Sequence, residues 1–225
     1  MAQIHHGRTS DHPFIDRVWE TFNITDGVYS ATPDRSWDLI MGVEQDGTRH
    51  MMLAGQATKA AKVPYRSGTY AVVISLTAGA YMPHAPGDTL LDSAEVLQNT
   101  DNDHFMLAGT EFSYPTFEAA EGLVAQMVDL GIIKGNDVVT QALNGQPKAM
   151  SKRAAQRHFI RTTGMTRKQL EQIERAQEAV KLLQQGKKPL DVAADAGYTD
   201  QSHLSKSLRR IMDAKPSGVD DIHKL

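Results

Sequence analysis

Residues 166–186, TRKQLEQIERAQEAVKLLQQG, form the stretch around which the rest of this chain is organised. Its apolar side chains recur at intervals of three and four, at Leu170, Ile173, Ala176, Val180 and Leu183. That spacing lines one face of an α-helix. Gly186 stands where the C-terminal cap of such a helix is expected. The stretch therefore predicts an amphipathic helix of about 18 residues, roughly 27 Å long.

A short basic segment that predicts two helices precedes this stretch. It reads NDVVTQALNGQPKAM over residues 136–150 and SKRAAQRHFIRTTG over residues 151–164. Ser151 can cap the second of these helices, and Ala155 and Phe159, four residues apart, supply its buried stripe. Long hydrogen-bond donors then occupy its exposed faces, and they are the first set of candidate DNA-binding residues: Lys152, Arg153, Gln156, Arg157 and Arg161.

A second segment of the same design follows, PLDVAADAGYTDQSHLSKSLRRIMDAKPS over residues 189–217. Residues 190–196 predict its first helix and Gly197 ends it. Thr199 or Asp200 can cap the next helix, whose apolar side carries Leu204, Leu208 and Ile211. Its outward residues form the second candidate set: Thr199, Gln201, Ser202, His203, Lys206, Arg209 and Arg210.

The charge of the chain is distributed unevenly. Residues 1–150 contain 9 Lys and Arg against 18 Asp and Glu, a net charge of −9, whereas residues 151–225 contain 15 against 9, a net charge of +6. A basic C-terminal third on an acidic body favours a polyanionic partner for that third alone. Chance clustering of surface charge is the alternative.

Composition excludes several classes of protein. The chain has no cysteine, which excludes a disulfide scaffold, thiolate zinc sites and thiol catalysis. No apolar run approaches the roughly 20 residues of a membrane span, and the N-terminus lacks a secretory apolar segment. A cytoplasmic protein that does not contact a membrane is expected, with no cofactor and no metal.

The N-terminal half predicts antiparallel strands, at residues 15–22, 37–43, 50–54 and 70–76, separated by turn sequences. Asp46-Gly47 predicts a hairpin between the second and third of these runs. Residues 77–104 predict mainly loop. A helix over residues 114–130 would be capped by Thr116 and ended by Gly131.

The predicted fold class is α+β, with an antiparallel strand-rich domain, a partial barrel or cupin-like, followed by an all-α tandem helix–turn–helix domain. The predicted limits are a flexible N-terminus at 1–12, a strand-rich effector or dimerisation domain at 13–112, a connecting helix at 113–135, a DNA-binding domain at 136–219, and a tail at 220–225.

Residues 136–219 resemble the tandem helix–turn–helix domain of the AraC/XylS family of bacterial transcription regulators. In the second segment, LDVAADAGYTDQSHLSKSLRRI followed by KPS is similar to the family pattern of a small-residue helix, Gly-aromatic, Ser-His-apolar, a basic pair and Pro-Ser. In the first, SKRAAQRHFIRTTGMT is similar to the first recognition helix of the family, with Gln156, Arg157, Phe159 and Gly164 in place. The resemblance implies two recognition helices, at about 151–162 and 200–212. No enzymatic activity is expected, because the sequence offers neither convergent metal ligands nor a nucleophile with a base at suitable spacing.

The sequence departs from the family pattern at several positions. Arg167 replaces a proline, and Leu204 and Leu208 replace frequent phenylalanines. Asp213 replaces a glycine, and Asp tolerates left-handed backbone less readily than Gly. These departures affect packing and caps more than base reading. Glu171 and Glu174 are expected to point away from DNA.

Residues 13–112 resemble more loosely an N-terminal β domain of such regulators. This resemblance implies that the domain binds a small-molecule effector or forms a homodimer. The residues that would contact the effector are unknown. A ligand pocket lined by Trp19, Trp37, Tyr70 and Tyr81 is one alternative, and core packing is the favoured one. A metal site formed by His50, His84 and His104 with Glu95 or Glu111 is another alternative, against which structural or surface histidines are favoured.

Three functions remain open. The leading hypothesis is a sequence-specific regulator of double-stranded DNA whose two recognition helices enter adjacent major-groove segments, which repeat at about 34 Å. RNA polymerase is a further partner if the chain is an activator. The second hypothesis is a small cupin-type metal-dependent enzyme with a basic helical appendage. The third is an architectural or protein-interaction module without sequence preference.

Overall fold

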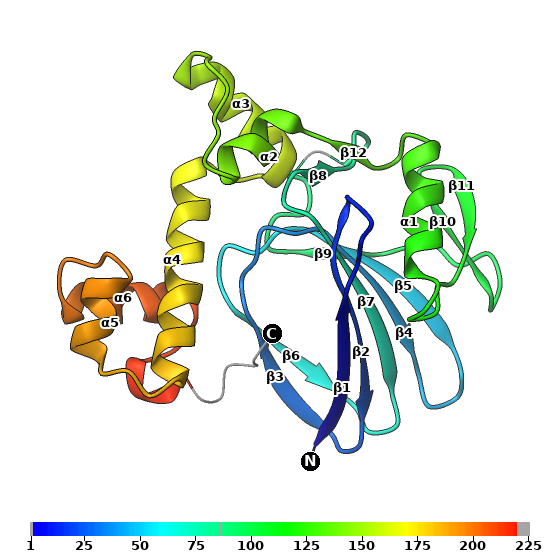
Figure 1. Cartoon of the computed structure of the whole chain (residues 1–225). Helices are drawn as coiled ribbons and strands as arrows, with labels where there is room; N and C mark the ends of the chain where they lie inside the picture. The colour runs from blue at the N-terminus through cyan, green and yellow to red at the C-terminus, as the bar shows by residue number, and fades with distance from the viewer. Residues whose placement is uncertain (1, 86, 220–225) are drawn as a thin grey trace. The chain divides into compact units, whose positions relative to one another are not determined.

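The computed structural model of the chain describes residues 2–85 and 87–219 and shows strands followed by helices (Figure 1). This order confirms the predicted fold class. The chain divides into two compact units. The strand unit comprises Met1–Gly27, Arg35–Gln56 and Tyr65–Met165, and the helical unit comprises Val28–Asp34, Ala57–Pro64 and Thr166–Leu225. The predicted tail at 220–225 lies outside the described residues.

A six-stranded antiparallel sheet in the order β1-β2-β7-β4-β5-β9 forms the strand unit. Its strands are β1 (Gln3–Thr9), β2 (Ile15–Asn23), β7 (Tyr70–Leu76), β4 (Asp38–Val43), β5 (Arg49–Ala54) and β9 (Ala94–Val96). The nearly continuous apolar run of β7 occupies an interior position, as a strand buried on both faces requires. The predicted hairpin at Asp46-Gly47 is confirmed, because β4 pairs with β5 across it and Gly47 has a φ of +82°.

The remaining strands of the described residues are short and form three two-stranded sheets. They are β3 (Gly27–Ala31), which pairs with β6 (Ala61–Tyr65), β8 (Ala80–Tyr81), which pairs with β12 (Lys134–Gly135), and the hairpin of β10 (His104–Leu107) and β11 (Thr110–Ser113). The region 77–104 is mainly loop, as predicted, with β8 and β9 as its strands.

The N-terminal residues correct one prediction. Instead of fraying, Gln3–Thr9 form β1, which pairs with β2 from Gln3 opposite Asn23 to Thr9 opposite Arg17. An edge strand needs only main-chain partners on one side, so its polar sequence gave no sign of it. Arg8 anchors the strand, because its Nη2 donates to the Phe117 carbonyl at 2.7 Å.

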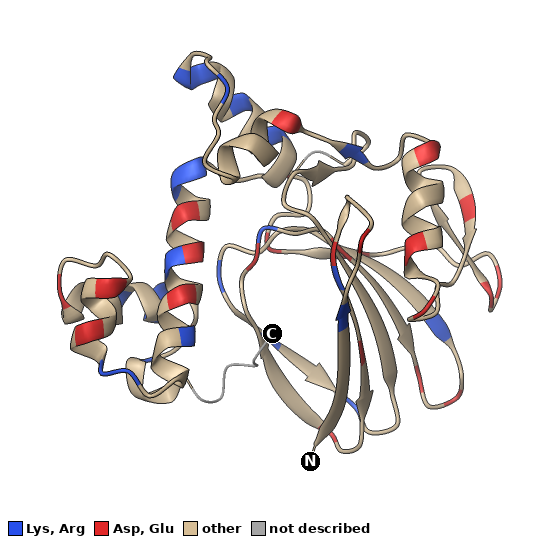
Figure 2. Ribbon diagram, in the orientation of Figure 1, with Lys and Arg blue, Asp and Glu red and all other residues tan. Residues whose placement is uncertain are grey.

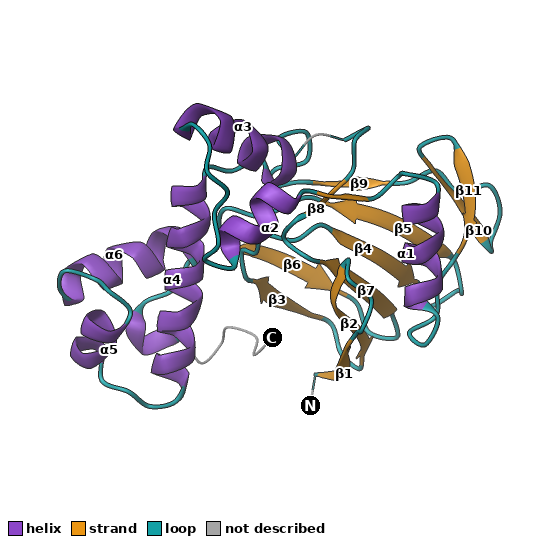
Figure 3. Cartoon of the chain, turned by 45° about the horizontal axis from the view of Figure 1, so that its top comes forward, coloured by secondary structure: helices purple, strands orange, loops and turns teal. Residues whose placement is uncertain are grey.

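Helix α1 (Ala120–Asp129) begins later than predicted and lies beside the β10–β11 hairpin (Figure 3). Thr116 does not cap it. The Thr116 hydroxyl accepts from the Ala119 N–H at 3.2 Å within a preceding turn, and the Phe117 carbonyl is bound by Arg8. The helix ends at Gly131, which has a φ of +70°, as predicted.

The remaining helices are α2 (Asp137–Leu143), α3 (Lys152–Thr163), α4 (Arg167–Gln184), α5 (Pro189–Asp195) and α6 (Gln201–Ile211), with a 3-10 helix at Pro216–Gly218. Helices α2 and α3 belong to the strand unit, and α4, α5 and α6 to the helical unit. The domain limits derived from the sequence place both helix pairs together, and those limits stay a prediction.

Helix α4 confirms the opening prediction. The five apolar residues named above are buried, together with Ala179. Thr166 and Gln169 form a reciprocal capping box at its start. Gly186 follows its end with a φ of +84°.

The ion pair between Arg8 and Glu121 predicts a dependence of stability on pH. The Arg8 guanidinium lowers the pKa of Glu121 from its ordinary 4.5 to about 2. Because the folded pKa lies below the unfolded one, the contribution is complete above pH 4.5 and is lost as pH falls toward 2. With the Glu121 side chain 34% exposed, solvent screening reduces it to about 1 kcal/mol.

Urea unfolding between pH 6 and pH 2 measures this contribution. The free energy of unfolding of Glu121→Gln should fall by about 1 kcal/mol less than that of the wild type over this range. Acid limbs that run parallel in the two proteins would show that the pair contributes nothing.

Candidate nucleic-acid interface

Helix α3 has a buried apolar side and an exposed basic side, because apolar and basic residues alternate along it at helical spacing. Ser151 caps its start, and its hydroxyl accepts from the Ala154 N–H at 3.2 Å. Phe159, Thr162 and Thr163 are buried, whereas Ala155 is only partly buried. All five candidate residues of this helix are exposed. Figure 2 shows Lys and Arg gathered on α3.

The exposed side of α3 borders an open hollow of about 470 Å³. The hollow brings together four of the five candidates with two further residues: Asp88, Arg153, Gln156, Arg157, Ile160 and Arg161. The Arg161 guanidinium lies 5.8 Å from the centre of the Tyr81 ring, a cation–π geometry that limits its motion. Asp88 was missed by sequence reasoning, because it comes from a loop more than sixty residues earlier and no local pattern marks it.

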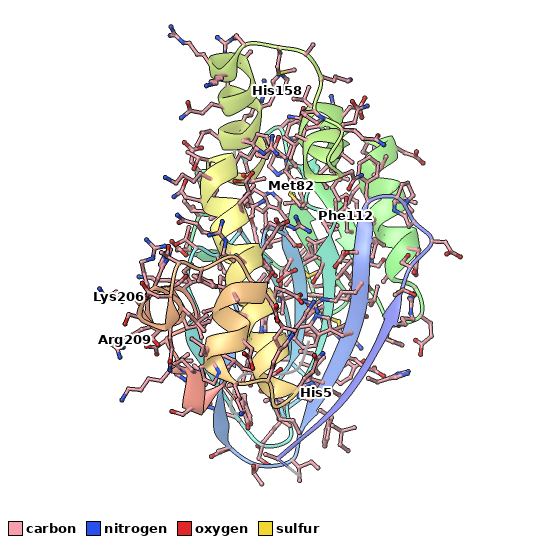
Figure 4. All side chains as sticks on the ribbon, turned by 60° about the vertical axis from the view of Figure 1, so that its left-hand side comes forward. His5, Met82, Phe112, His158, Lys206 and Arg209 are labelled. Atoms are coloured by element: carbon pink, nitrogen blue, oxygen red, sulfur yellow. The ribbon has the colours of Figure 1, made fainter. Side chains whose placement is uncertain are left out.

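Helix α6 has the same division. Asp200 is its N-cap and accepts from the His203 N–H at 2.7 Å. Leu204, Leu208 and Ile211 are buried as predicted. All seven candidates of the second set are exposed. Figure 4 shows Lys206 and Arg209 projecting from this helix.

Neighbouring side chains orient two of these candidates. Arg210 Nη2 donates to Gln172 Oε1 at 3.1 Å, and both line a second hollow of about 240 Å³ with His203, Lys206 and Ser207. The His203 ring stands edge-on to Tyr198, with centroids 5.2 Å apart. Gln172 comes from α4, and sequence reasoning, which treated α4 as a spacer, did not include it.

The buried Tyr198, which lies between α5 and α6 in the sequence, contacts both α6 and α4. The Tyr198 hydroxyl donates to Ser207 Oγ at 3.2 Å, and burial raises the pKa of Tyr198. Arg175 of α4 lies over the same ring at 5.7 Å and donates to the Gly197 carbonyl at 3.3 Å. Helix α4 thus packs on α5 and α6 as the central helix of this unit.

The structure shows the backbone conformation of Asp213 and a partner of Glu171, two residues that the comparison with the family pattern singled out. Asp213, just after α6, adopts a φ of +51°, the left-handed conformation for which the family uses glycine. Glu171 pairs with Arg167, with 2.9 Å between Oε1 and Nε. The expectation that Glu171 and Glu174 face away from DNA stays a prediction.

The histidines considered as metal ligands lie in separate pairs. His104 Nδ1 is 2.9 Å from Asp101 Oδ1, which raises the pKa of His104, and His50 Nδ1 is 3.9 Å from Glu44 Oε1. Burial lowers the pKa of His84. Within residues 2–85 and 87–219, no three His, Cys, Asp or Glu side chains gather in a group that could hold a metal ion.

The aromatic residues considered for a ligand pocket differ in burial. Trp37 is completely buried in the core, whereas Trp19, Tyr70 and Tyr81 are partly exposed. Burial raises the pKa of Tyr70, and the hydrogen bond to the Glu20 carboxylate raises it further. Trp37 therefore packs as a core residue, which was the favoured interpretation.

Comparison with known proteins identifies the class of the helical segment. Residues 148–221 match the family model described as "Helix-turn-helix domain". The chain therefore carries an AraC-type helix–turn–helix domain, which confirms the resemblance to the AraC/XylS family. It is a DNA-binding protein of transcription regulation.

Solved structures of ToxT from Vibrio cholerae are similar to this chain over nearly its full length. One from strain O395 is 8% identical, covers 100% of this chain and 99% of that chain, and has a TM-score of 0.42. Another, bound to (E)-4-(8-methylnaphthalen-1-yl)but-3-enoic acid, is 8% identical, covers 96% and 97%, and also has a TM-score of 0.42. Both TM-scores lie below 0.5.

No curated protein matches the chain. Among the described residues, no helix combines the length and the apolar character that crossing a membrane requires.

Proposed function

We propose that the chain is a sequence-specific transcription regulator in which α3 and α6 are both recognition helices that enter adjacent major-groove segments. One observation carries this proposal: each helix buries an apolar side and exposes a side rich in Arg, Lys and Gln. Arg and Lys can donate hydrogen bonds to guanine and Gln can pair with adenine, and Arg and Lys farther along the helix can contact phosphates. A second copy of the chain is a proposed partner, and RNA polymerase is another if the chain is an activator.

Selection of bound sequences from a random duplex pool tests this function. The expected product contains two short elements about one helical turn apart, one for each recognition helix. Affinity for the selected duplex is then compared with that for a scrambled duplex at the same salt concentration, because phosphate contacts alone depend on salt and not on sequence. Equal affinities would reject sequence-specific regulation and favour the architectural alternative.

The carboxylate of Asp88 is expected to lower the affinity of α3 for DNA. It shares the hollow with Arg153 and Arg157, where phosphates would approach. Removing this negative charge should raise affinity for the selected duplex by about two- to fivefold, the range of an exposed charge interaction. Fluorescence anisotropy at low salt measures the effect in Asp88→Asn.

Asp129→Asn is the matched control for this prediction, because Asp129 is exposed on α1 of the same unit and does not line the hollow. Equal gains in the two variants would assign the effect to net charge, and a loss in Asp88→Asn would contradict the proposed orientation of α3.

We further propose that a small ligand bound in the strand unit modulates this activity. Arg17 on β2 and Asp38 on β4 both lie opposite Ser75 of β7, so the three form one row across adjacent strands. Ser75 is 1% exposed, and its hydroxyl finds no hydrogen-bond partner among the described residues. The buried Arg17 Nε and Trp19 Nε1 likewise lack an acceptor there. Beside the Asp38 carboxylate, these donors suit a small neutral molecule with acceptor oxygens.

Ser75→Ala tests the row without knowledge of the ligand. A buried hydroxyl without a partner costs stability, so the ligand-free variant should be more stable than the wild type by about 1 kcal/mol. Ser207→Ala is the control, because the Ser207 hydroxyl is buried and used by Tyr198, and its loss should destabilise. Chemical denaturation of both variants decides. A destabilised Ser75→Ala protein would show that the hydroxyl already has a structural partner such as water.

A further inference from the structure

The C-terminal end of α3 is bonded to three separate segments of the strand unit. A helix leaves its last carbonyls without partners of its own. Here the Arg161 carbonyl accepts from the Gly87 N–H at 2.9 Å. The Thr162 carbonyl accepts from Trp37 Nε1 at 3.4 Å and from Gln56 Nε2 at 3.3 Å.

These contacts are buried and closely fitted. Trp37 and Gln56 are completely buried. A Cβ on Gly87 would meet the Gly164 nitrogen at 2.3 Å, so the loop and the helix end touch backbone to backbone. The Gln56 main chain is itself fixed, because its carbonyl accepts from the Asp92 N–H at 2.9 Å. The side chain of Gln56 therefore has little freedom to leave Thr162.

The end of α6 is bonded in a comparable way within the helical unit. The Ile211 carbonyl accepts from the Ala60 N–H at 2.7 Å. Ala60 follows Gln56 by four residues in the sequence QATKA. One short stretch of chain after β5 thus supplies a hydrogen-bond donor to the last turn of each helix.

We propose that Gln56 and Ala60 each position one recognition helix within its own unit: Gln56 holds the C-terminal end of α3, and Ala60 holds that of α6. The inference rests on the proposed function of these two helices. Gln56 and Ala60 are positioning residues that contact neither base nor phosphate. Loss of Gln56 removes one of the two donors to the Thr162 carbonyl, and loss of the Ala60 N–H removes the donor to the Ile211 carbonyl.

Three variants test these two contacts on the duplex selected by the wild-type protein. Gln56→Leu keeps the buried volume but removes the donor to Thr162. Ala60→Pro removes the N–H that Ile211 binds, and Ala60→Gly is its control, since glycine keeps that N–H. Melting temperatures establish that each protein is folded, and hydroxyl-radical footprints and affinities are then compared.

Each donor variant should weaken binding roughly two- to tenfold, as expected for the loss of a single hydrogen bond. Gln56→Leu should lose protection at one element of the duplex and Ala60→Pro at the other, whereas Ala60→Gly should match the wild type. If Ala60→Pro does not fold, the footprint of Gln56→Leu decides alone. Wild-type footprints and affinities in the folded donor variants would overturn the inference while leaving the proposed function intact. Failure of the wild-type protein to select any sequence would instead reject the function itself.

Discussion

An alanine inserted after Ala179 in α4 is expected to unfold the helical unit. The insertion rotates every later residue of the helix by about 100°. Val180 and Leu183, both buried, then leave the face that packs on α5 and α6. Displacing two such side chains should cost about 4 kcal/mol or more. Far-UV circular dichroism during thermal unfolding, with binding to the selected duplex, measures the effect.

A glycine inserted after Gly186 is the control, because Gly186 has no neighbour within 4 Å of an added side chain and already has a φ of +84°. It lengthens the α4–α5 connection without shifting the buried face of α4. An Ala179 insertion that melts like the wild type and still binds tightly would contradict both the packing role and the spacer role of α4. A folded insertion protein that has lost binding would support α4 as a spacer whose length matters.

Arg157→Ala is expected to lose about 1–3 kcal/mol of binding free energy for the selected duplex, roughly 5- to 150-fold in affinity. Arg157 is exposed in the middle of α3 and lines the hollow beside Gln156. If it donates to guanine, base preference at one position of the duplex should relax. Repeating the selection with the variant, and measuring affinity at several salt concentrations, tests both statements.

Arg157→Lys separates base reading from charge. Lysine retains the positive charge but cannot present the planar pair of donors that arginine does. The lysine variant should keep the salt dependence of the wild type and lose its base preference. Wild-type affinity and preference in Arg157→Ala would show that α3 does not read DNA through this residue.

Local patterns predicted the local structure well. The apolar spacing of residues 166–186 predicted α4, Ser151 caps α3 as predicted, and Asp200, one of the two expected caps, caps α6. Caps and helical faces depend on residues within about four positions of each other, so a single sequence contains the information. The exposed candidates of α3 and α6 follow from the same periodicity.

Predictions that depended on distant partners were incomplete. The strand β1 is formed by residues expected to be frayed, because its partner β2 supplies the main-chain hydrogen bonds. Helix α1 starts after Ala119 and not near Thr116, in a region where Arg8 binds the Phe117 carbonyl. Asp88 lines the hollow of α3 because of the course of its loop, and no periodicity in the sequence predicts that course.

The sequence by itself determined that this chain has an α+β fold and an AraC-type helix–turn–helix segment, since both follow from short-range patterns of apolar, capping and basic residues. Only the tertiary structure decided that α3 belongs with the strands and that α4 is the central helix of a separate unit. The physical reason is the range of the bonds involved. Trp37 and Gln56 reach Thr162 across 125 and 106 residues of chain, and such hydrogen bonds form only once the fold has brought buried donors and helix carbonyls together.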